Sequence, residues 1–416
     1  MVILEKKVRE EYKMTDFGEI PLEWELTTIG NISNKIMDGT HTTPLYKASG
    51  IPFYSVENVT NNEFKKTKFI SKSAHEINSK RCLVEKNDIL MTRIGKIGQV
   101  KLIDWDVNAS IYVSLALIKL KDAINSRYVY QFMKSQLFIS EALKRSLLNA
   151  APPKINLGDI YSIPVLLPAS IQEQQKIAEI LSTVDEQLEN TDELIEKIKE
   201  LKKGLMQQLL TKGIGHNKFK QTELGEIPVS WEVVELKNAA EIIMGQSPSS
   251  SSYNDEGEGL PFYQGKTEFG YMYPNVKKWC SQPTKIAEAD DVLFSVRAPV
   301  GEVNICEEKS CIGRGLGAIR SIDGKSVPWF LFYTLQNSTD KFNSLSQGSA
   351  FTAINGGELR SFKISFPRFQ EQQKIAEILS EVDEHIESYE IEKEKYMDLK
   401  KGLMQNLLTG KIRVAI

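Results

Sequence analysis

The sequence predicts an α+β protein in which two similar mixed α/β modules are separated by two long helices. Three observations support this fold class. Segments of the first half return about 200 residues later, two stretches carry the heptad spacing of long helices, and the regions between hold short β-branched and aromatic runs divided by turn residues. We therefore expect a twisted, mostly antiparallel sheet in each module, and an antiparallel intramolecular coiled coil formed by the two helices.

The chain repeats itself in the order A–B–A′–B′, which predicts an internal pseudo-twofold relation. Segment A is residues 1–169, B is 170–212, A′ is 213–369 and B′ is 370–412. Residues 15–25 read TDFGEIPLEWE and return at 222–232 as TELGEIPVSWE. Residues 172–182 read QEQQKIAEILS and return unchanged at 370–380. The B segments match closely, whereas the A segments share only a few short motifs and single residues. Drift after an old duplication would also vary the loops, but it would have eroded the B segments too. The contrast favours a scaffold that was kept while its contents changed.

Internal marks align the two A segments with each other. Asp88 matches Asp291, and a glycine follows ten residues later in both segments. An arginine lies between these marks in each segment, and we align Arg93 with Arg297. The residues after the arginine are Ile-Gly-Lys in the first segment and Ala-Pro-Val in the second, which predicts different loop geometries.

Each B segment carries a heptad seam, in which apolar residues are spaced alternately by four and three positions. Such a narrow stripe suits another helix, and the other copy in the chain is the simplest partner. Pro168 and Pro367 precede the segments as start signals, and Gly213 and Gly410 follow as stop signals. A helix over residues 172–210 would be about 58 Å long at roughly 1.5 Å per residue. The predicted seam residues are Ile177, Leu181, Val184, Leu188, Ile195, Ile198, Leu205, Ile375, Leu379, Val382, Ile386, Tyr389, Tyr396 and Leu403.

The formal net charge of −3 conceals an uneven distribution along the chain. Residues 1–169 hold 23 basic and 18 acidic residues, and residues 213–369 hold 16 and 18. Both B segments are acidic, so their outer faces fit solvent or a docked protein better than DNA phosphates. We expect domain boundaries at 1–167, 168–213, 214–367 and 368–416. Strand-forming runs fall at 100–103, 111–118, 292–296 and 362–366, and helical stretches fit 126–148 and 327–345.

Several loops carry residues that suit nucleic-acid contacts. Residues 38–44 and 245–252 occupy equivalent places and are rich in small hydrogen-bonding side chains, which can reach base edges or phosphates. Residues 64–68 interleave basic and aromatic side chains, and residues 93–96 set two cations beside a glycine. Each loop could equally be an ordinary surface turn. The candidate DNA-contacting residues are Thr40, His41, Thr42, Lys65, Lys66, Lys68, Arg93, Lys96, Lys154, Gln246, Ser247, Ser249, Ser250, Lys266, Arg297 and Arg314.

The cysteines and the apolar runs indicate a reduced, cytoplasmic protein without a membrane span. The four cysteines form no C-x-x-C pair and the four histidines do not cluster with them, which argues against a zinc site and a disulfide framework. The N-terminal residues 1–12 are too charged for a secretory signal. The longest apolar run, residues 111–118, is far shorter than the roughly 20 residues that span a bilayer.

The sequence carries no convincing catalytic motif. Residues 149–153, NAAPP, resemble only superficially the Asn/Asp-Pro-Pro-aromatic motif of DNA adenine methyltransferases. The glycine-rich residues 313–317 lie in a β-rich stretch without the strand–turn–helix unit of a dinucleotide site, and no Walker loop is present. We therefore predict no catalytic residue, no metal ligand and no cofactor site in this chain.

These motifs together resemble the specificity subunits of type I restriction-modification systems. The resemblance rests on the Gly-Glu-Ile-Pro-x-x-Trp openings, the Gln-Glu-Gln-Gln-Lys-Ile-Ala-Glu-Ile-Leu helix starts, the Leu-Lys-Lys-Gly-Leu-Met-Gln helix ends and the strand over residues 291–301. Several of these motifs occur twice and in the same order, and the resemblance covers nearly the whole chain.

The resemblance implies that each A segment is a target recognition domain for one half of a bipartite, asymmetric site on double-stranded DNA. The helices would fix the gap between the halves and dock two methyltransferase subunits, and restriction/translocase subunits would join them. S-adenosylmethionine, ATP and magnesium would then bind in the partner subunits. A specificity chain of a fused restriction-methylation enzyme, a methyltransferase or nuclease in its own right, and a coiled-coil adaptor without a DNA role stay open as alternatives.

Overall fold

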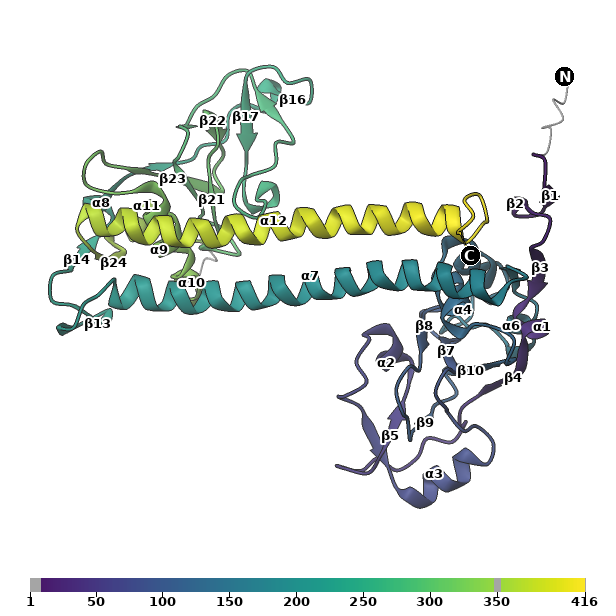
Figure 1. Ribbon diagram of the computed structural model, residues 1–416. Helices are drawn as coiled ribbons and strands as arrows, with labels where there is room; N and C mark the ends of the chain where they lie inside the picture. The colour runs from purple at the N-terminus through teal and green to yellow at the C-terminus, as the bar shows by residue number, and fades with distance from the viewer. Residues whose placement is uncertain (1–8, 348–352, 416) are drawn as a thin grey trace, which may run out of the picture. The chain divides into compact units, whose positions relative to one another are not determined.

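The computed structural model describes residues 9–347 and 353–415, so part of the charged N-terminal segment lies outside it. The described chain forms two compact units, shown in Figure 1. Unit 1 comprises residues 1–191 and 392–416, and unit 2 comprises residues 192–391. Each unit therefore contains one sheet domain and a half of each long helix.

Unit 1 is a mixed α/β domain whose sheets are mostly antiparallel, as the sequence predicts. A four-stranded antiparallel sheet has the order β4-β10-β7-β8, and a smaller sheet, β6-β5-β9, contains the parallel pair β5–β9. Hairpin β1-β2 and pair β3-β11 complete the unit. The strands are β1 (Tyr12–Thr15), β2 (Gly18–Pro21), β3 (Glu25–Thr28), β4 (Ser33–Asp38), β5 (Ile51–Tyr54), β6 (Lys68–Ile70), β7 (Ile89–Thr92), β8 (Val100–Leu102), β9 (Ser110–Ile111), β10 (Leu115–Leu120) and β11 (Pro164–Leu167). The helices are α1 (Ile29–Ile32), α2 (Val56–Thr60), α3 (Lys72–Ser79), α4 (Ser126–Met133), α5 (Gln136–Lys144) and α6 (Leu157–Tyr161).

Unit 2 repeats this arrangement with small additions. Its four-stranded sheet has the order β15-β23-β20-β21, and the smaller sheet grows to five strands, β16-β18-β17-β22-β19, with a parallel pair β17–β22. The strands are β12 (Phe219–Thr222), β13 (Gly225–Pro228), β14 (Glu232–Glu235), β15 (Ala240–Met244), β16 (Tyr253–Asn254), β17 (Leu260–Tyr263), β18 (Trp279–Cys280), β19 (Ile286–Ala287), β20 (Val292–Ser295), β21 (Val303–Ile305), β22 (Ser310–Ile312), β23 (Leu316–Ser321) and β24 (Lys363–Phe366). The shorter helices are α8 (Leu236–Ala239), α9 (Pro328–Gln336), α10 (Thr339–Gln347) and α11 (Gly356–Ser361), with 3-10 turns η1 (Ser250–Ser252) and η2 (Lys266–Glu268).

The two long helices are α7 (Ile171–Lys212) and α12 (Phe369–Leu407). Within unit 1, Asp185 of α7 pairs with Lys400 of α12. Within unit 2, Lys199 pairs with Glu390 and, further along α7, Lys202 pairs with Asp383, which lies earlier on α12. Because the contacts advance along one helix while they retreat along the other, the helices run antiparallel in unit 2, as predicted.

The predicted helical stretches 126–148 and 327–345 are each broken into two helices. In the first, Ser135 leaves the helical conformation and its hydroxyl accepts a hydrogen bond from Phe138 N at 3.3 Å, so it caps the start of α5. In the second, α9 ends at Gln336 and α10 begins at Thr339. The predicted strand 111–118 is likewise divided between β9 and β10, since residues 112–114 turn between two different sheets.

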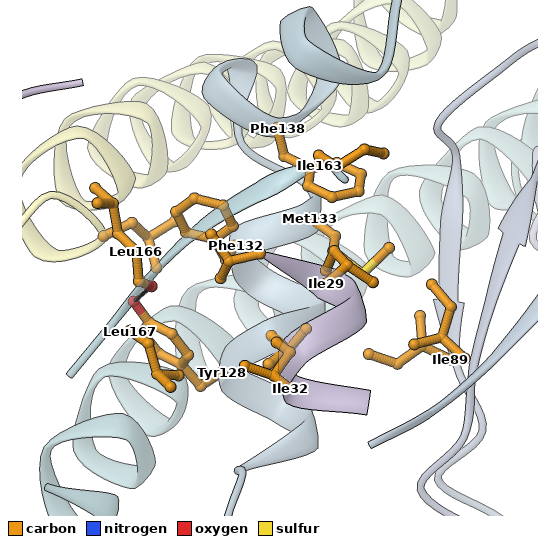
Figure 2. Close-up of a cluster of buried hydrophobic side chains, with 14 of the residues drawn as sticks. Ile29, Ile32, Ile89, Tyr128, Phe132, Met133, Phe138, Ile163, Leu166 and Leu167 are labelled. Atoms are coloured by element: carbon orange, nitrogen blue, oxygen red, sulfur yellow. Dashed lines mark hydrogen bonds between the residues drawn. The ribbon is translucent and has the colours of Figure 1, made fainter. Parts of the chain in front are cut away.

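The core of unit 1 lies between its sheet, α4 and α5, and the ends of the long helices. Figure 2 shows side chains from α1, α4, α5, β7 and β11 meeting in this core. Tyr128 is fully buried among them, and its hydroxyl donates to Leu166 O at 2.7 Å, so its polar atom is satisfied. Leu181 of α7 and Leu408, which follows α12, belong to the same core. The sheet domain and the helix ends therefore share one buried cluster, and unit 2 has the equivalent cluster around Leu209, Leu210, Ile375 and Leu379.

Candidate nucleic-acid interface

The duplicated tryptophan and glutamate fasten each sheet domain to the start of a long helix. Trp24 Nε1 donates to Glu173 Oε2 at 3.2 Å in unit 1, and Trp231 Nε1 donates to Glu371 Oε2 at 3.0 Å in unit 2. Both tryptophans are fully buried. These motif residues therefore act in docking the domain to the helix, which explains why the sequence repeats them.

The neighbouring glutamines make a second repeated attachment. In unit 1 Gln174 Oε1 accepts from Asn125 N at 2.9 Å, and Gln174 Nε2 donates to Pro168 O at 2.8 Å. In unit 2 Gln372 accepts from Val327 N at 3.0 Å and donates to Pro367 O at 2.9 Å. Each glutamine ties the start of α4 or α9 to the start of a long helix. Because these contacts go to backbone atoms, they tolerate changes in the side chains of the domain.

The predicted seam residues of both long helices are all buried or half-buried. Ile177, Leu181, Ile375, Leu379 and Ile386 are fully inaccessible to solvent. The same four-and-three spacing also includes Lys202 and Lys400, and these lysines pair with the carboxylates of Asp383 and Asp185. The seam is therefore a mixture of apolar packing and a few fixed ion pairs.

The alignment of Arg93 with Arg297 is wrong by one residue. Thr92 O accepts from Gly98 N in unit 1, and Ser295 O accepts from Gly301 N in unit 2, both at 3.0 Å, which makes Thr92 equivalent to Ser295. Arg93 is therefore equivalent to Val296, and Arg297 to Ile94. The difference has a physical consequence, because successive residues of an extended chain face opposite sides. The side chain of Arg93 is buried and that of Arg297 is exposed.

The first polar loop of unit 1 is held firmly against the neighbouring chain. Thr40 N donates to Ile111 O at 3.1 Å, and Val113 N donates to Thr40 O at 3.0 Å. A Cβ atom on Gly39 would lie 2.0 Å from Ile111 O, so only glycine fits this close approach. His41 and Thr42 are exposed beyond this point. The loop thus presents polar side chains from a fixed backbone.

The structure brings the hairpin loop of residues 93–96 beside Lys154. Gly95 N donates to Pro153 O at 2.8 Å, and Arg93 Nε donates to Ile155 O at 3.2 Å. Lys96 and Lys154 are both exposed in this region. Two predicted cations that are far apart in the sequence therefore belong to one part of the surface.

The lysines of residues 65–68 lie on another part of unit 1. Lys65 and Lys66 are exposed and their backbone N–H groups donate to Glu63 Oε1 at 2.8 and 3.0 Å, which lowers the pKa of that carboxyl. Lys68 Nζ lies 5.1 Å from the centre of the Tyr46 ring, within the range of a cation–π interaction. The lysine side chains at 65 and 66 keep their ammonium groups in solvent.

In unit 2 the polar loop lies beside the glycine-rich turn. Gln246 N donates to Ile312 O at 3.1 Å, and Arg314 N donates to Ser247 Oγ at 3.4 Å. The side chains of Gln246 and Arg314 are exposed. Ser249 and Ser250 are exposed at the start of η1, whereas Lys266 forms an ion pair of 2.8 Å with Glu302. Val296 N donates to Gly315 O at 3.0 Å, which brings the loop of Arg297 to the loop of Arg314.

Sequence reasoning missed two residues that organise the surface of unit 1. Asp38 is the first residue of the polar loop 38–44 and Arg81 follows α3, and their side chains form an ion pair. Forty-three residues separate them, so no local spacing could have joined them. The available signal was that Asp38 belongs to the loop of residues 38–44, which its composition had already singled out.

Two searches of the described residues were negative. None of the helices in that part of the chain is both long and apolar enough to cross a bilayer. Over the same ranges, 9–347 and 353–415, there is no group of three or more histidine, cysteine, aspartate or glutamate residues that could hold a metal ion.

Comparison with known proteins gives consistent matches over both repeats. The family model for the type I restriction modification DNA specificity domain matches residues 21–200 and 228–396. A protein of Methanocaldococcus jannaschii, provisionally named the type I restriction enzyme MjaX specificity subunit, is 39% identical over 427 residues, and the match covers all of both chains. The type I restriction enzyme MjaVIII specificity subunit of the same organism is 28% identical over 100% of this chain and 99% of that protein.

Solved structures show the same fold at low sequence identity. The S subunit of the type I restriction-modification system from M. genitalium aligns with a TM-score of 0.65 at 17% identity, over 95% of this chain and 97% of that one. A chain from a structure of type I R-M complex assembly and conformational transition aligns with a TM-score of 0.57 at 22% identity, over 94% and 99% of the chains. The chain therefore belongs to the family of type I restriction-modification specificity subunits.

Proposed function

We propose that this chain is the DNA sequence-reading subunit of a type I restriction-modification complex and works in the cytoplasm. Each sheet domain reads one half of a bipartite, asymmetric site on double-stranded DNA. The observation that carries the proposal is the contrast between the repeated anchors, such as Trp24–Glu173 and Trp231–Glu371, and the unlike side chains on the loops. Two domains that are attached to the helices in the same way but carry different loops would suit the recognition of two different DNA sequences.

The catalytic steps belong to partner subunits in this proposal. Two methyltransferase subunits dock on the long helices, with restriction/translocase subunits around them, and these partners bind S-adenosylmethionine, ATP and magnesium. Leu201 and Leu399 support docking, because they occupy equivalent places in the two repeats and are 55% and 50% exposed. Exposed leucines that recur at the same place on two helices fit a surface covered by another protein.

Residues in both domains are proposed to contact DNA. In the first domain they are Thr40, His41, Thr42, Lys65, Lys66, Lys68, Lys96 and Lys154, with Arg93 supporting them from within. In the second domain they are Gln246, Ser247, Ser249, Ser250, Lys266, Arg297 and Arg314. The exposed lysines suit phosphates, and the exposed arginines, glutamine and hydroxyls suit base edges as well.

The test is to express the chain with its methyltransferase partner and to map methylated adenines across the host genome. We expect methylation at one bipartite sequence with two unlike halves, and none when this chain is left out. Methylation without any sequence preference would contradict the proposal and favour an adaptor without a DNA-reading role. Methylation by this chain alone would favour an enzyme in its own right.

A second test concerns the role of the helices in spacing. Seven residues inserted after Thr191 in α7, and seven after Ile391 in α12, keep the heptad phase and both Asp–Lys pairs. Each insertion adds about 10 Å of helix, which corresponds to about three base pairs at roughly 3.4 Å each. We expect the methylated site to gain about three base pairs in its gap while both half-sites stay the same. An unchanged gap with altered half-site bases would reject this role, and a length-neutral exchange of the same heptads is the control.

A further inference from the structure

A buried carboxylate at the start of the loop of residues 38–44 contacts the side chains of two arginines and one histidine. Asp38 ends β4, and its side chain is only 4% exposed. Its Oδ1 accepts a hydrogen bond from Arg81 Nη2, while its Oδ2 accepts from Arg93 Nη1 at 2.9 Å and lies 3.0 Å from His41 Nε2. An ionised carboxylate only accepts hydrogen bonds, so His41 donates through Nε2–H.

The three partners of Asp38 differ in what they have left to offer. Arg93 is 11% exposed, and it also donates to Val113 O at 3.1 Å and to Ile155 O at 3.2 Å. Arg93 therefore neutralises the buried carboxylate, and three of its N–H groups are engaged inside the domain. The side chains of Arg81 and His41 are 57% and 60% exposed. The charge of Arg81 and the remaining hydrogen-bonding atoms of both side chains face outward.

The side chain of Arg81 is positioned by Asp38 and keeps most of its N–H groups available. Among the described residues, its guanidinium makes no hydrogen bond other than the one to Asp38. Its backbone is fixed where α3 ends, because Arg81 N donates to Asn78 O at 3.1 Å. An arginine whose position is already fixed loses less conformational entropy when it binds, so it binds more tightly than a free side chain that makes the same contact. The guanidinium has five N–H donors in a planar fork, and most of these donors remain available.

Among the residues that the structure describes, the second domain has no equivalent arrangement. Strand pairing sets Asp38 opposite Ala116 and Met244 opposite Gly317, at the same step of the two four-stranded sheets. Met244 thus takes the place of Asp38, and it cannot accept the hydrogen bonds of two arginines. Val296 takes the place of Arg93. The second domain must therefore read its half-site with a different set of side chains.

We propose that Arg81 is a base-reading residue of the first domain and contacts a guanine through the N–H groups that Asp38 leaves free. Two adjacent N–H groups of arginine match O6 and N7 of guanine in the major groove, which is the commonest specific contact in protein–DNA complexes. Asp38 is the positioning residue that aims Arg81, and His41 is held beside it at the same surface. This assignment rests on the proposed function, and it names one side chain that the sequence did not single out.

The test uses the full chain in complex with its methyltransferase partner and plasmids that carry the wild-type site with each half-site base varied in turn. Arg81→Lys keeps the charge but removes the fork, and Arg81→Ala removes both. Both variants should lose discrimination at one guanine of one half-site by about five- to a hundredfold, the range expected for one bidentate pair. Discrimination in the other half-site should stay unchanged, which also shows that the complex is folded.

Lys80→Ala is the matched control, because Lys80 is the exposed neighbour of Arg81 and its loss removes the same charge. It should reduce methylation slightly and equally on all plasmids. Asp38→Asn should relax discrimination at the same guanine as Arg81→Lys, whereas a purely structural role would weaken every position of that half-site alike.

Three outcomes separate the possibilities. Arg81 variants that still discriminate as the wild type does would overturn the assignment. Arg81 variants that weaken methylation equally on all plasmids would overturn it too, because they would make Arg81 a phosphate contact. A wild-type complex that shows no preference between plasmids would instead refute the proposed function, on which the assignment depends.

Discussion

Each unit has an aspartate at the equivalent position of its helix pair, but the groups around the two carboxylates differ. Asp185 in unit 1 accepts from Lys134 and Gln131 at 3.0 and 2.8 Å and pairs with Lys400. Its counterpart in unit 2 is Asp383, which lies 198 residues later and pairs with a lysine at 2.6 Å. That second carboxylate is completely buried and also accepts from two tyrosine hydroxyls at 2.8 and 2.7 Å.

Both units share the lysine–aspartate pair between the long helices. The other groups around each aspartate come from the sheet domain and differ between the units. In unit 1 the groups around the aspartate include charged side chains that are partly exposed to solvent. Burial and the nearby charge of Lys134 lower the pKa of Lys400. In unit 2 burial and the nearby carboxylate raise the pKa of Tyr271 and of Tyr333. A buried ion pair often contributes little net stability and instead selects one register. We interpret the repeated pair as a device that fixes how the helices align in each unit.

The largest expected effect is the loss of Asp383. Asp383→Asn leaves Lys202, which is 11% exposed, as a buried charge without a counter-ion. We expect the free energy of unfolding to fall by about 3–5 kcal/mol, the usual cost of breaking a buried pair. Asp185→Asn should cost less, because that carboxylate is 20% exposed and water can reach its lysines. Urea unfolding followed by tryptophan fluorescence measures both, with Glu384→Gln and Glu186→Gln as exposed neighbouring controls. Equal losses of unfolding free energy in the two variants would contradict the difference between the two carboxylates.

The next effect separates the two arginines that the sequence appeared to align. Arg93→Ala removes the partner that neutralises buried Asp38, so we expect a loss of about 2–3 kcal/mol in unfolding free energy. Arg297→Ala removes an exposed side chain and should change stability by less than about 0.5 kcal/mol. Thermal unfolding of the two variants in parallel checks this. Similar destabilisation by both substitutions would contradict the one-residue offset.

The smallest effect is a pH dependence that belongs to Asp185. Burial alone would raise the pKa of this carboxyl, but the charge of Lys134 and the hydrogen bonds from Lys400 and Gln131 outweigh it and lower the pKa. The stabilisation is therefore complete above the unfolded-state pKa of about 3.9, and it is lost as the pH falls through the lower folded-state value. Urea midpoints measured between neutral and acidic pH should fall less steeply for Asp185→Asn than for the wild type. Parallel pH profiles would exclude this contribution.

The periodicity of the sequence was sufficient to predict the two long helices, which form the framework of the fold. The heptad stripes located α7 and α12 to within a few residues, because a narrow apolar seam repeated over so many turns is hard to mistake. The pairing of the helices followed from the need of each seam for a partner in the same chain, and the antiparallel direction from a domain between them that is large enough for the chain to return. The break at Ser135 was missed because serine is tolerated within a helix and caps one only when the chain turns there.

The site was less predictable, because its chemistry depends on contacts between distant residues. Composition drew attention to the loops of residues 38–44 and 93–96, but it could not show that Arg93 points inward. A shift of one residue reverses the facing of an extended chain, and the alignment of two divergent segments is uncertain by that amount. Arg81 stands at the end of a short helix without any local signal, and only the fold brings it to Asp38.

The division of the chain between the two units also bears on the order in which they form during synthesis. Unit 2 is one continuous stretch, residues 192–391, so all of it is translated before residues 392–416. Unit 1 needs residues 392–416, since Leu407 and Leu408 complete its core and Arg413 pairs with the buried carboxylate of Glu173 at 2.5 Å. Domains usually mature in the order in which they are translated. Here unit 1, whose sheet domain is translated first, is completed only by residues 392–416, which are translated after the whole of unit 2.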